Sequence, residues 1–381
     1  MCRTGLRLTL PRATTGVKHV RSPLWTSPEH PTNGPLTSDG DLCRLAGAMR
    51  DFIAALPKVE LHVHLVGSAS PATVLTLARR HPQRGVPTDE ADLLRFYEFT
   101  DFGHFIDVYA AVNDLVTTGD DVAALVLGLA AEQARRNVRY AEVTVSATSH
   151  LRAGIAPEEL DEALTTSRER AKAEHGVELA WVFDIPGVWD RDFGLTSAKY
   201  AVTHRPPGTV GFGLGGFEAD APRRAFREAF TIARDAGLHC VPHAGETTGP
   251  DQVREALDDL HAERIGHGTS AARDPELLRR LAAERITLEV CPTSNLRTAA
   301  VKDIGDHPLP KLLDAGVPVT LATDDPGMFH TDLDREYLLC HEAFGLGKPE
   351  LAELARTGVR ASFAPEDLKR ALLAEIDGLG H

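Results

Sequence analysis

Short apolar runs rich in β-branched residues alternate with amphipathic stretches along most of the chain. Such runs are typical of buried strands, because both faces of a strand in a parallel sheet are covered. The eight runs lie at residues 59–65, 138–146, 179–186, 209–216, 238–246, 264–268, 286–292 and 318–325. Several of the intervening stretches end in glycine, which commonly terminates helices. Strands joined by helices pair in parallel, so the pattern predicts an α/β fold.

Eight strand–helix units predict a closed (β/α)8 TIM barrel. A doubly wound open sheet is the alternative fold, but no GxGxxG motif follows the first strand, which disfavours it. The interval between the first two strands, residues 66–137, is long and predicts extra helices after strand 1, over one mouth of the barrel. The segment from Asp332 onward predicts further helices at the C-terminus.

Residues 1–48 differ in composition from the rest of the chain. Five basic residues precede the first acidic residue, Glu29, and Pro, Thr and Ser then dominate. There is no continuous apolar segment of the kind found in secretory signals. The composition also suits a transit peptide, but we favour a disordered tail or a mis-annotated N-terminal extension with true initiation at Met49. Residues 49–381 are predicted to form a single barrel domain.

Composition excludes several classes of partner. The net charge of −14 argues against nucleic acid, whose binding needs clustered Lys and Arg. No apolar run approaches the roughly 20 residues that cross a bilayer, so no membrane partner is expected. The five cysteines are few, odd in number and widely spaced, which indicates reduced thiols in a cytoplasmic protein. Nothing in the sequence indicates the oligomeric state.

Polar residues gather at the carboxyl ends of four predicted strands, the end at which TIM barrels carry their active sites. They are His62 and His64 on strand 1, His243 and Glu246 on strand 5, His267 on strand 6, and Asp324 and Asp325 on strand 8. An H-x-H pair alone is weak, although residues i and i+2 of a strand face the same way. Imidazoles together with a carboxylate suit Zn²⁺ and leave room for a water.

This set suggests hydrolysis by a metal-activated water. Glu246 could protonate the substrate, and His267 could orient or deprotonate the water. Dinuclear barrel hydrolases often bridge two metals with a modified lysine on strand 4, and "TVGFGLGG" contains none, which favours one ion. Zn²⁺ is the preferred ion, with Fe²⁺, Mn²⁺ and Co²⁺ as alternatives.

Six motifs resemble the adenosine deaminase family of the amidohydrolase superfamily. They are "LPKVELHVHL", "FGLGG", "HAGE", "RIGHG", "CPTSN" and "ATDDP", in this order from Leu56 to the C-terminus. The resemblance implies one Zn²⁺ ion per chain, held by His62, His64, His243 and Asp324. It also implies hydrolytic deamination of the 6-amino group of a small adenine-containing substrate.

The same resemblance implies roles for the remaining residues. Glu246 corresponds to the proton donor to purine N1, and His267 to the residue that handles the metal-bound water. Asp325 corresponds to the acid that contacts N7, and the Gly216 backbone to the group that bonds N3. His64, Gly216 and Asp325 are therefore expected to border the substrate.

Val66 departs from the family pattern. Members acting on adenosine usually carry an acid there, which reads the ribose 5′-hydroxyl, whereas valine accepts no hydrogen bond. The chain is more similar to a branch that deaminates 6-amino-6-deoxyfutalosine, whose substrate bears a carbon-linked benzoate at that end. "HVHLVGSAS", "FTDFGHFIDVY" and "VFDIPG" carry this similarity. Arg152, with Ser146 and Ser149, is the candidate receptor for the benzoate.

Three functions remain open at this point. The preferred one is conversion of 6-amino-6-deoxyfutalosine to futalosine in menaquinone biosynthesis. The alternative with the same chemistry is an adenosine or adenine deaminase of purine salvage. From a different class, the chain could be a catalytically inactive barrel kept for ligand binding.

Overall fold

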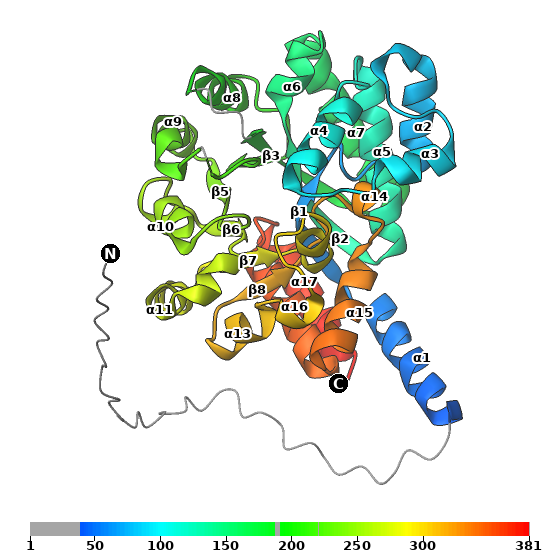
Figure 1. Cartoon of the computed structure of the whole chain (residues 1–381), viewed down its shortest axis with the longest axis vertical. Helices are drawn as coiled ribbons and strands as arrows, with labels where there is room; N and C mark the ends of the chain where they lie inside the picture. Colours follow the sequence, from blue (N-terminus) through cyan, green and yellow to red (C-terminus); the bar gives the residue numbers. More distant parts are fainter. Residues whose placement is uncertain (1–38, 187–190, 220, 381) are drawn as a thin grey trace, which may run out of the picture.

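A computed structural model describes residues 39–186, 191–219 and 221–380. Its eight strands form one parallel sheet in the order β1 to β8. The strands are β1 (Lys58–His64), β2 (Val138–Val145), β3 (Glu178–Ile185), β4 (Thr209–Leu214), β5 (His239–Ala244), β6 (Arg264–His267), β7 (Thr287–Val290) and β8 (Val319–Leu321). β1 meets the loop after β8 at an isolated parallel bridge between Val63 and Asp324, which brings the sheet round into a barrel. The predicted (β/α)8 barrel is confirmed (Figure 1).

Helices surround the sheet (Figure 1). Before and after β1 lie α1 (Asp39–Ala55), α2 (Pro71–Arg80), η1 (Pro82–Arg84), α3 (Glu90–Phe96), α4 (Phe102–Asn113) and α5 (Gly119–Arg135). Between β2 and β8 lie α6 (Ala147–Arg152), α7 (Pro157–His175), α8 (Arg191–Thr203), η2 (Arg223–Phe226), α9 (Arg227–Asp235), α10 (Pro250–Asp258), η3 (Thr269–Arg273), α11 (Pro275–Glu284), α12 (Pro292–Arg297), η4 (Ile304–Asp306) and α13 (Leu309–Asp314). After β8 come α14 (Pro326–Phe329), α15 (Leu333–Phe344), α16 (Lys348–Ala361) and α17 (Glu366–Gly378).

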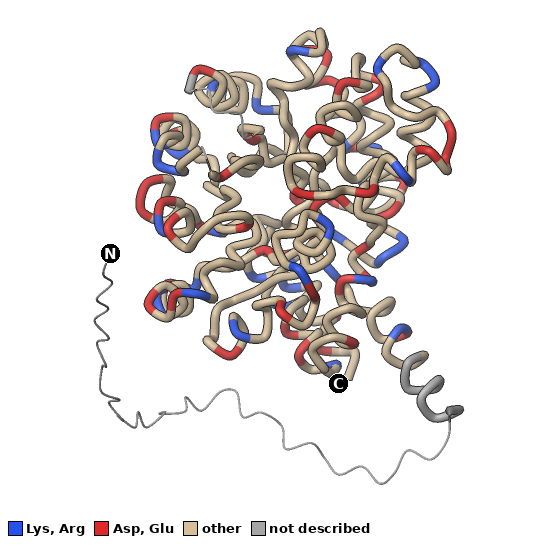
Figure 2. Tube along the Cα trace, in the orientation of Figure 1, with Lys and Arg blue, Asp and Glu red and all other residues tan. Residues whose placement is uncertain are grey.

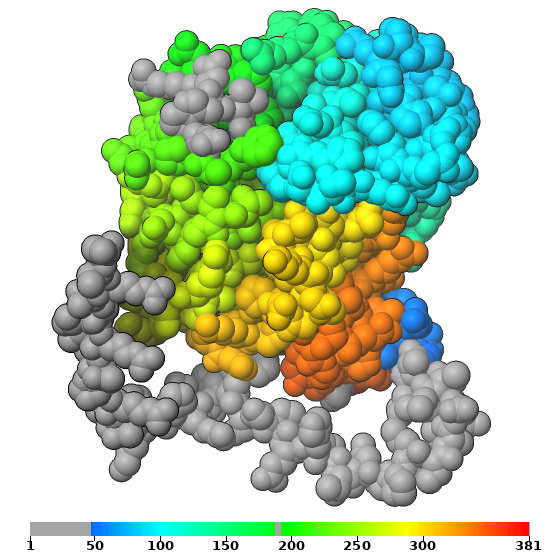
Figure 3. All heavy atoms as spheres, in the orientation of Figure 1, coloured from blue at the N-terminus to red at the C-terminus, as the bar shows by residue number. Residues whose placement is uncertain are grey.

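The extra helices predicted after strand 1 and at the C-terminus are present. The segment α2–α5 forms one body beside the segments that follow β7 and β8, as Figure 3 shows. Within this body α4 carries aromatic residues that face the substrate cavity described below. At the other end of the chain α16 packs against β1 and β8, where the barrel closes.

A helix spans the N-terminal boundary that the sequence suggested. Helix α1 begins at Asp39, so the division predicted between residues 48 and 49 falls inside a helix. Met49, Phe52 and Ile53 on this helix are buried in the core. Residues 1–38 lie outside the described part of the chain, so the predicted extension stays a prediction there.

Charged residues lie mainly on the outer helices, where Lys and Arg are interspersed with Asp and Glu (Figure 2). Within the described residues, no helix is long and apolar enough to span a membrane. Cys240, Cys291 and Cys340 are free and buried. The cytoplasmic location stays a prediction.

Several strands are shorter at their carboxyl ends than predicted. β5 ends at Ala244 and β8 ends at Leu321, so Glu246, Asp324 and Asp325 lie in the loops that follow. The two aspartates therefore do not lie on strand 8, where the sequence placed them. Loop backbone, and not strand pleating, sets the direction of each carboxylate.

Candidate active site

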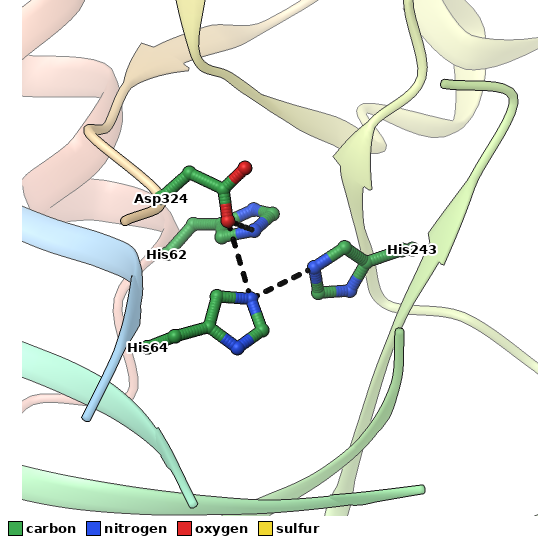
Figure 4. Close-up of side chains that lie close together, drawn as sticks. All are labelled: His62, His64, His243 and Asp324. Atoms are coloured by element: carbon green, nitrogen blue, oxygen red, sulfur yellow. Dashed lines mark hydrogen bonds and ion pairs between the residues drawn. The ribbon is translucent and has the colours of Figure 1, made fainter. Parts of the chain in front are cut away.

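Four buried side chains converge at the mouth of the barrel (Figure 4). His62 and His64 come from the end of β1, His243 from β5, and Asp324 from the loop after β8. His64 Nε2 lies 3.1 Å from His243 Nε2 and 3.2 Å from Asp324 Oδ1. His62 Nε2 lies 3.3 Å from the same carboxylate oxygen. The structure thus brings together all four residues that the sequence suggested as ligands.

The donor set fits a single metal ion. Ligand atoms about 2.0–2.1 Å from one tetrahedral ion are roughly 3.3 Å apart, close to the spacings seen here. Both ring nitrogens of His62 and the Nδ1 of His243 are buried without a hydrogen-bond partner. Burial lowers the pKa of His243 well below the usual range, so its imidazole is unprotonated. These are the properties expected of neutral imidazoles that ligate a cation.

Backbone strain accompanies two of the site residues. Asp324 has a φ of +66° and His267 a φ of +58°, values that cost a non-glycine residue about 1–3 kcal/mol. The strained turn at Asp324 aims its carboxylate at the histidines, and Ser294 Oγ donates to Oδ2 at 2.7 Å. Such strain persists only where surrounding contacts fix the conformation.

A contact outside the histidine cluster orients His62. Its Nδ1 lies 3.4 Å from Glu289 Oε2, and Arg264 Nε donates to the other oxygen of that carboxylate at 2.7 Å. Although burial lowers it, the nearby carboxylates of Asp324 and Glu289 raise the pKa of His62 to about 10. A bound cation would replace that proton.

His267 is held by a chain of hydrogen bonds that fixes its tautomer. The Leu309 N–H donates to His307 Nδ1 at 3.1 Å, which leaves the His307 proton on Nε2. That group faces Asn295 Oδ1 at 3.2 Å, so the Asn295 amide nitrogen faces His267 Nδ1, also at 3.2 Å. The proton of His267 therefore lies on Nε2, which points toward Glu246 and Asp324, each 3.7 Å away.

Two further carboxyls border the histidine cluster. Burial, with Asp324 and Glu218 adding to it, raises the pKa of Glu246 well above its usual range. Burial and the neighbouring Asp324 raise the pKa of Asp325 in the same way, and its Oδ1 has no hydrogen-bond partner. Both side chains can therefore carry a proton at neutral pH and donate it to a ligand.

These groups line a cavity of about 300 Å³. Its lining includes His64, His243, Glu246, His267, Asp324 and Asp325. Gly216, with a φ of +71° in the loop after β4, forms part of the wall. Phe102 and Phe105 of α4 contribute aromatic surface. The cavity therefore joins an acid-rich, metal-binding end to an aromatic flank.

Arg152, Ser146 and Ser149 also line the cavity, as the sequence suggested. The guanidinium of Arg152 lies 4.5 Å from the ring centre of Phe193, a cation–π distance. Among the residues that the structure describes, Arg152 forms no ion pair with an acidic side chain. It is an available cation beside aromatic surface.

Val66 is not brought to the cavity. β1 ends at His64 and residues 65–68 form a turn, so the strand alternation that placed Val66 beside the histidines stops before it. Its side chain is 2% exposed and packs in the hydrophobic core. Val66 therefore does not line the cavity, and its side chain does not read the 5′ end of a bound substrate by direct contact.

The comparisons with known proteins agree with this geometry. A family profile described as adenosine deaminase matches residues 57–379. The chain belongs to the adenosine deaminase family. It is 51% identical over 328 residues to the aminodeoxyfutalosine deaminase of Streptomyces coelicolor, an alignment that covers 86% of this chain and 85% of the relative.

Solved structures of the family have the same fold. The chain resembles an adenine deaminase from Arthrobacter aurescens at a TM-score of 0.80 and 31% identity, over 85% of this chain and 98% of that one. It resembles equally an amidohydrolase from Burkholderia ambifaria, solved with bound zinc, at a TM-score of 0.80 and 28% identity, over 92% and 96% of the two chains. This member of the deaminase family is thus a hydrolase with a donor set able to bind a metal.

Sequence reasoning missed several polar residues of this deaminase site. Asp184 at the end of β3 is buried, lines the cavity and accepts a hydrogen bond from Ser146 Oγ at 2.7 Å. Tyr109 of α4 lines the cavity beside His64. Both residues stand in stretches that carry the resemblance, Asp184 at a strand end within "VFDIPG" and Tyr109 at the end of "FTDFGHFIDVY", so either could have been considered.

Proposed function

We propose that this enzyme hydrolyses the 6-amino group of 6-amino-6-deoxyfutalosine, giving futalosine and ammonia, in menaquinone biosynthesis. The observation that supports this substrate is the cavity itself, whose lining includes the histidine cluster, Arg152 and the aromatic side chain of Phe193. A benzoate carboxylate at the outer end would pair with the guanidinium while its ring meets aromatic surface. The Streptomyces coelicolor relative, named aminodeoxyfutalosine deaminase, supports the same substrate.

We further propose one Zn²⁺ ion per chain, held by His62, His64, His243 and Asp324. When bound, this ion lowers the pKa of a coordinated water toward neutrality. The zinc in the Burkholderia ambifaria relative supports the choice of metal.

The remaining residues then have distinct proposed tasks. Glu246, whose pKa is raised, donates its proton to purine N1 as the water adds to carbon 6. His267 orients the attacking water, because its proton lies on Nε2 and the nitrogen that could accept one is occupied by Asn295. Asp325 hydrogen-bonds N7, and the Gly216 backbone meets N3. The proton lost by the attacking water passes to the departing amine, and the hydroxyl proton of the adduct returns to Glu246 as ammonia leaves and the oxo product forms.

The deciding experiment compares substrates in pairs. Purified enzyme is given 6-amino-6-deoxyfutalosine, adenosine and adenine, and the ultraviolet change from amine to oxo purine gives kcat/KM for each. We expect the benzoate-bearing substrate to be preferred. Adenine deaminase is the second candidate, favoured by the Arthrobacter aurescens relative, and faster turnover of adenine or adenosine would replace our proposal.

Arg152→Met tests the receptor directly. Losing a hydrogen-bonded charge pair costs about 1.5–3 kcal/mol, so kcat/KM for 6-amino-6-deoxyfutalosine should fall roughly 10- to 150-fold, with adenosine unaffected. Arg139→Met, which removes an exposed arginine paired with Glu375, is the matched control. An equal loss on both substrates would rule out a benzoate contact.

Glu246→Ala tests whether the protein is an enzyme at all. If the zinc-loaded wild type and zinc-loaded Glu246→Ala are both inactive, the protein is instead a ligand-binding barrel.

A further inference from the structure

A buried carboxylate in the loop after β4 binds the backbone of the loop that carries Glu246. Glu218 is 1% exposed. Its Oε2 accepts the N–H groups of Thr247 and Thr248 at 3.0 and 2.9 Å, and the Thr248 hydroxyl at 2.8 Å. Its Oε1 lies 3.3 Å from the amide nitrogen of Glu246, which donates to it. Three consecutive amides therefore converge on one side chain.

Arg223 completes this arrangement. It is fully buried, and its guanidinium lies 3.4 Å from Glu218 Oε1. Its Nε donates to the carbonyl oxygen of His243 at 2.8 Å. The same pair of side chains thus contacts the backbone on both sides of Gly245, whose φ of +70° marks the turn between His243 and Glu246.

The energetics favour a fixed loop. A buried carboxylate is costly unless it is paired and hydrogen-bonded, and Glu218 has both kinds of partner. Although burial raises it, Arg223 and the threonine donors hold the pKa of Glu218 below its usual value, so the charge persists. Several charge-assisted bonds to adjacent residues leave the backbone at Glu246 little freedom.

We propose that Glu218 is a positioning residue for Glu246. It acts through the backbone of residues 246–248, with Arg223 as its counter-charge, and holds the acid at the distance from the purine ring that proton transfer requires. This inference rests on the proposed role of Glu246 as proton donor. Glu218 itself does not line the substrate cavity, so its effect should be on turnover and not on binding.

The test measures kcat, KM, metal content and melting temperature for Glu218→Gln. The amide nitrogen of glutamine would face backbone donors, so the loop should shift. Displacing a reacting group by about 1 Å costs roughly 100-fold, and we expect kcat to fall about 10- to 100-fold with KM changed less than about threefold. Metal content should equal that of wild type.

Asp274→Asn is the matched control. Asp274 also accepts two backbone N–H groups, at 3.0 and 3.1 Å, and pairs with Arg254, but at the start of α11 and away from the site. It should lower the melting temperature and leave kcat unchanged. The inference is overturned if folded, metal-loaded Glu218→Gln keeps the wild-type kcat, whether or not its KM rises.

Thr248→Val provides a second measurement if Glu218→Gln does not fold. It removes a single hydroxyl donor to Glu218 in a nearly equal volume, and kcat should fall about two- to tenfold. Wild-type kcat in this variant would then count against the proposal. All variants are assayed on whichever of the three adenine compounds the wild type uses fastest. The test of Glu218 therefore stays valid even if the proposed substrate is wrong.

Discussion

The site separates its ionisable side chains by environment. Glu246 and Asp325 are buried beside another carboxylate, which raises the pKa of each and lets it hold a proton. Glu218, which contacts the backbone of the loop that carries Glu246, is paired with Arg223 and stays ionised. His267 is neutral because burial lowers its pKa to about 4. The pocket and the loop contact beside it therefore hold proton donors, a fixed anion and a neutral imidazole at the same pH.

Asn295→Asp tests the tautomer of His267. The carboxylate would accept where the amide donates, so His267 Nδ1 would take the proton and Nε2 would lose it. A reversed tautomer lowered kcat about 10⁴-fold in a serine protease triad, and we expect about 10²-fold or more here. Steady-state kinetics at matched metal content measures this.

Asn295→Leu provides the comparison for that variant. It removes the donor without supplying an acceptor, so the loss in kcat should be smaller, about tenfold. If Asn295→Asp is as active as wild type, or more active than Asn295→Leu, the chain through His307 does not set the proton position.

At the scale of elements, the eight strands and the four residues of the metal-binding cluster could be predicted from the sequence. Buried β-branched runs identified all eight strands, and H-x-H, "HAGE" and "ATDDP" identified the four converging residues. The strand ends could not be located, because the positive φ of Asp324 depends on contacts made across the barrel. His307 and Asn295 were missed for the same reason, since a hydrogen-bond chain has no pattern in the local sequence.

Gly67→Ala tests how the turn after β1 places Asp325. A Cβ at Gly67 would lie 1.6 Å from Asp325 Oδ1, while the Gly67 carbonyl accepts the Gly327 N–H at 2.9 Å. The carboxylate must move, so kcat/KM should fall roughly 100-fold. Gly378→Ala in α17, where a Cβ meets nothing within 4 Å, should keep wild-type kinetics. Unchanged kinetics in Gly67→Ala would remove Asp325 from the substrate contacts.

At the scale of the whole molecule, buried charge extends well beyond the site. Arg264 joins Glu289 to Glu142 of β2 inside the barrel and donates to the Ala361 carbonyl at the end of α16. Lys58 at the start of β1 is buried against Asp334 of α15. Because each buried ion needs its partner, the C-terminal helices are tied to the strands that carry the metal-binding residues. Substitutions that break the ion pairs of Arg264 or Lys58 should therefore lower stability and activity together.

Glu336 gives the fold a pH dependence that can be isolated. It is fully buried in α15, where it accepts the Thr293 N–H at 3.0 Å and the Thr331 hydroxyl. Burial raises its pKa from 4.5 to about 7. The folded state therefore holds this proton more tightly than the unfolded state does, and stability falls as the pH rises from about 4.5 to 7.

Glu336→Gln should remove that dependence, since its amide can donate to Thr331 and its oxygen can still accept from Thr293. Urea unfolding at pH 4.5 and pH 8 gives the free energy of unfolding of both proteins, and all other titrating groups cancel in the difference. The variant should gain about 2–3 kcal/mol relative to wild type between the two pH values. A difference that does not change with pH would mean that folding leaves the pKa of Glu336 unchanged, which would contradict the prediction.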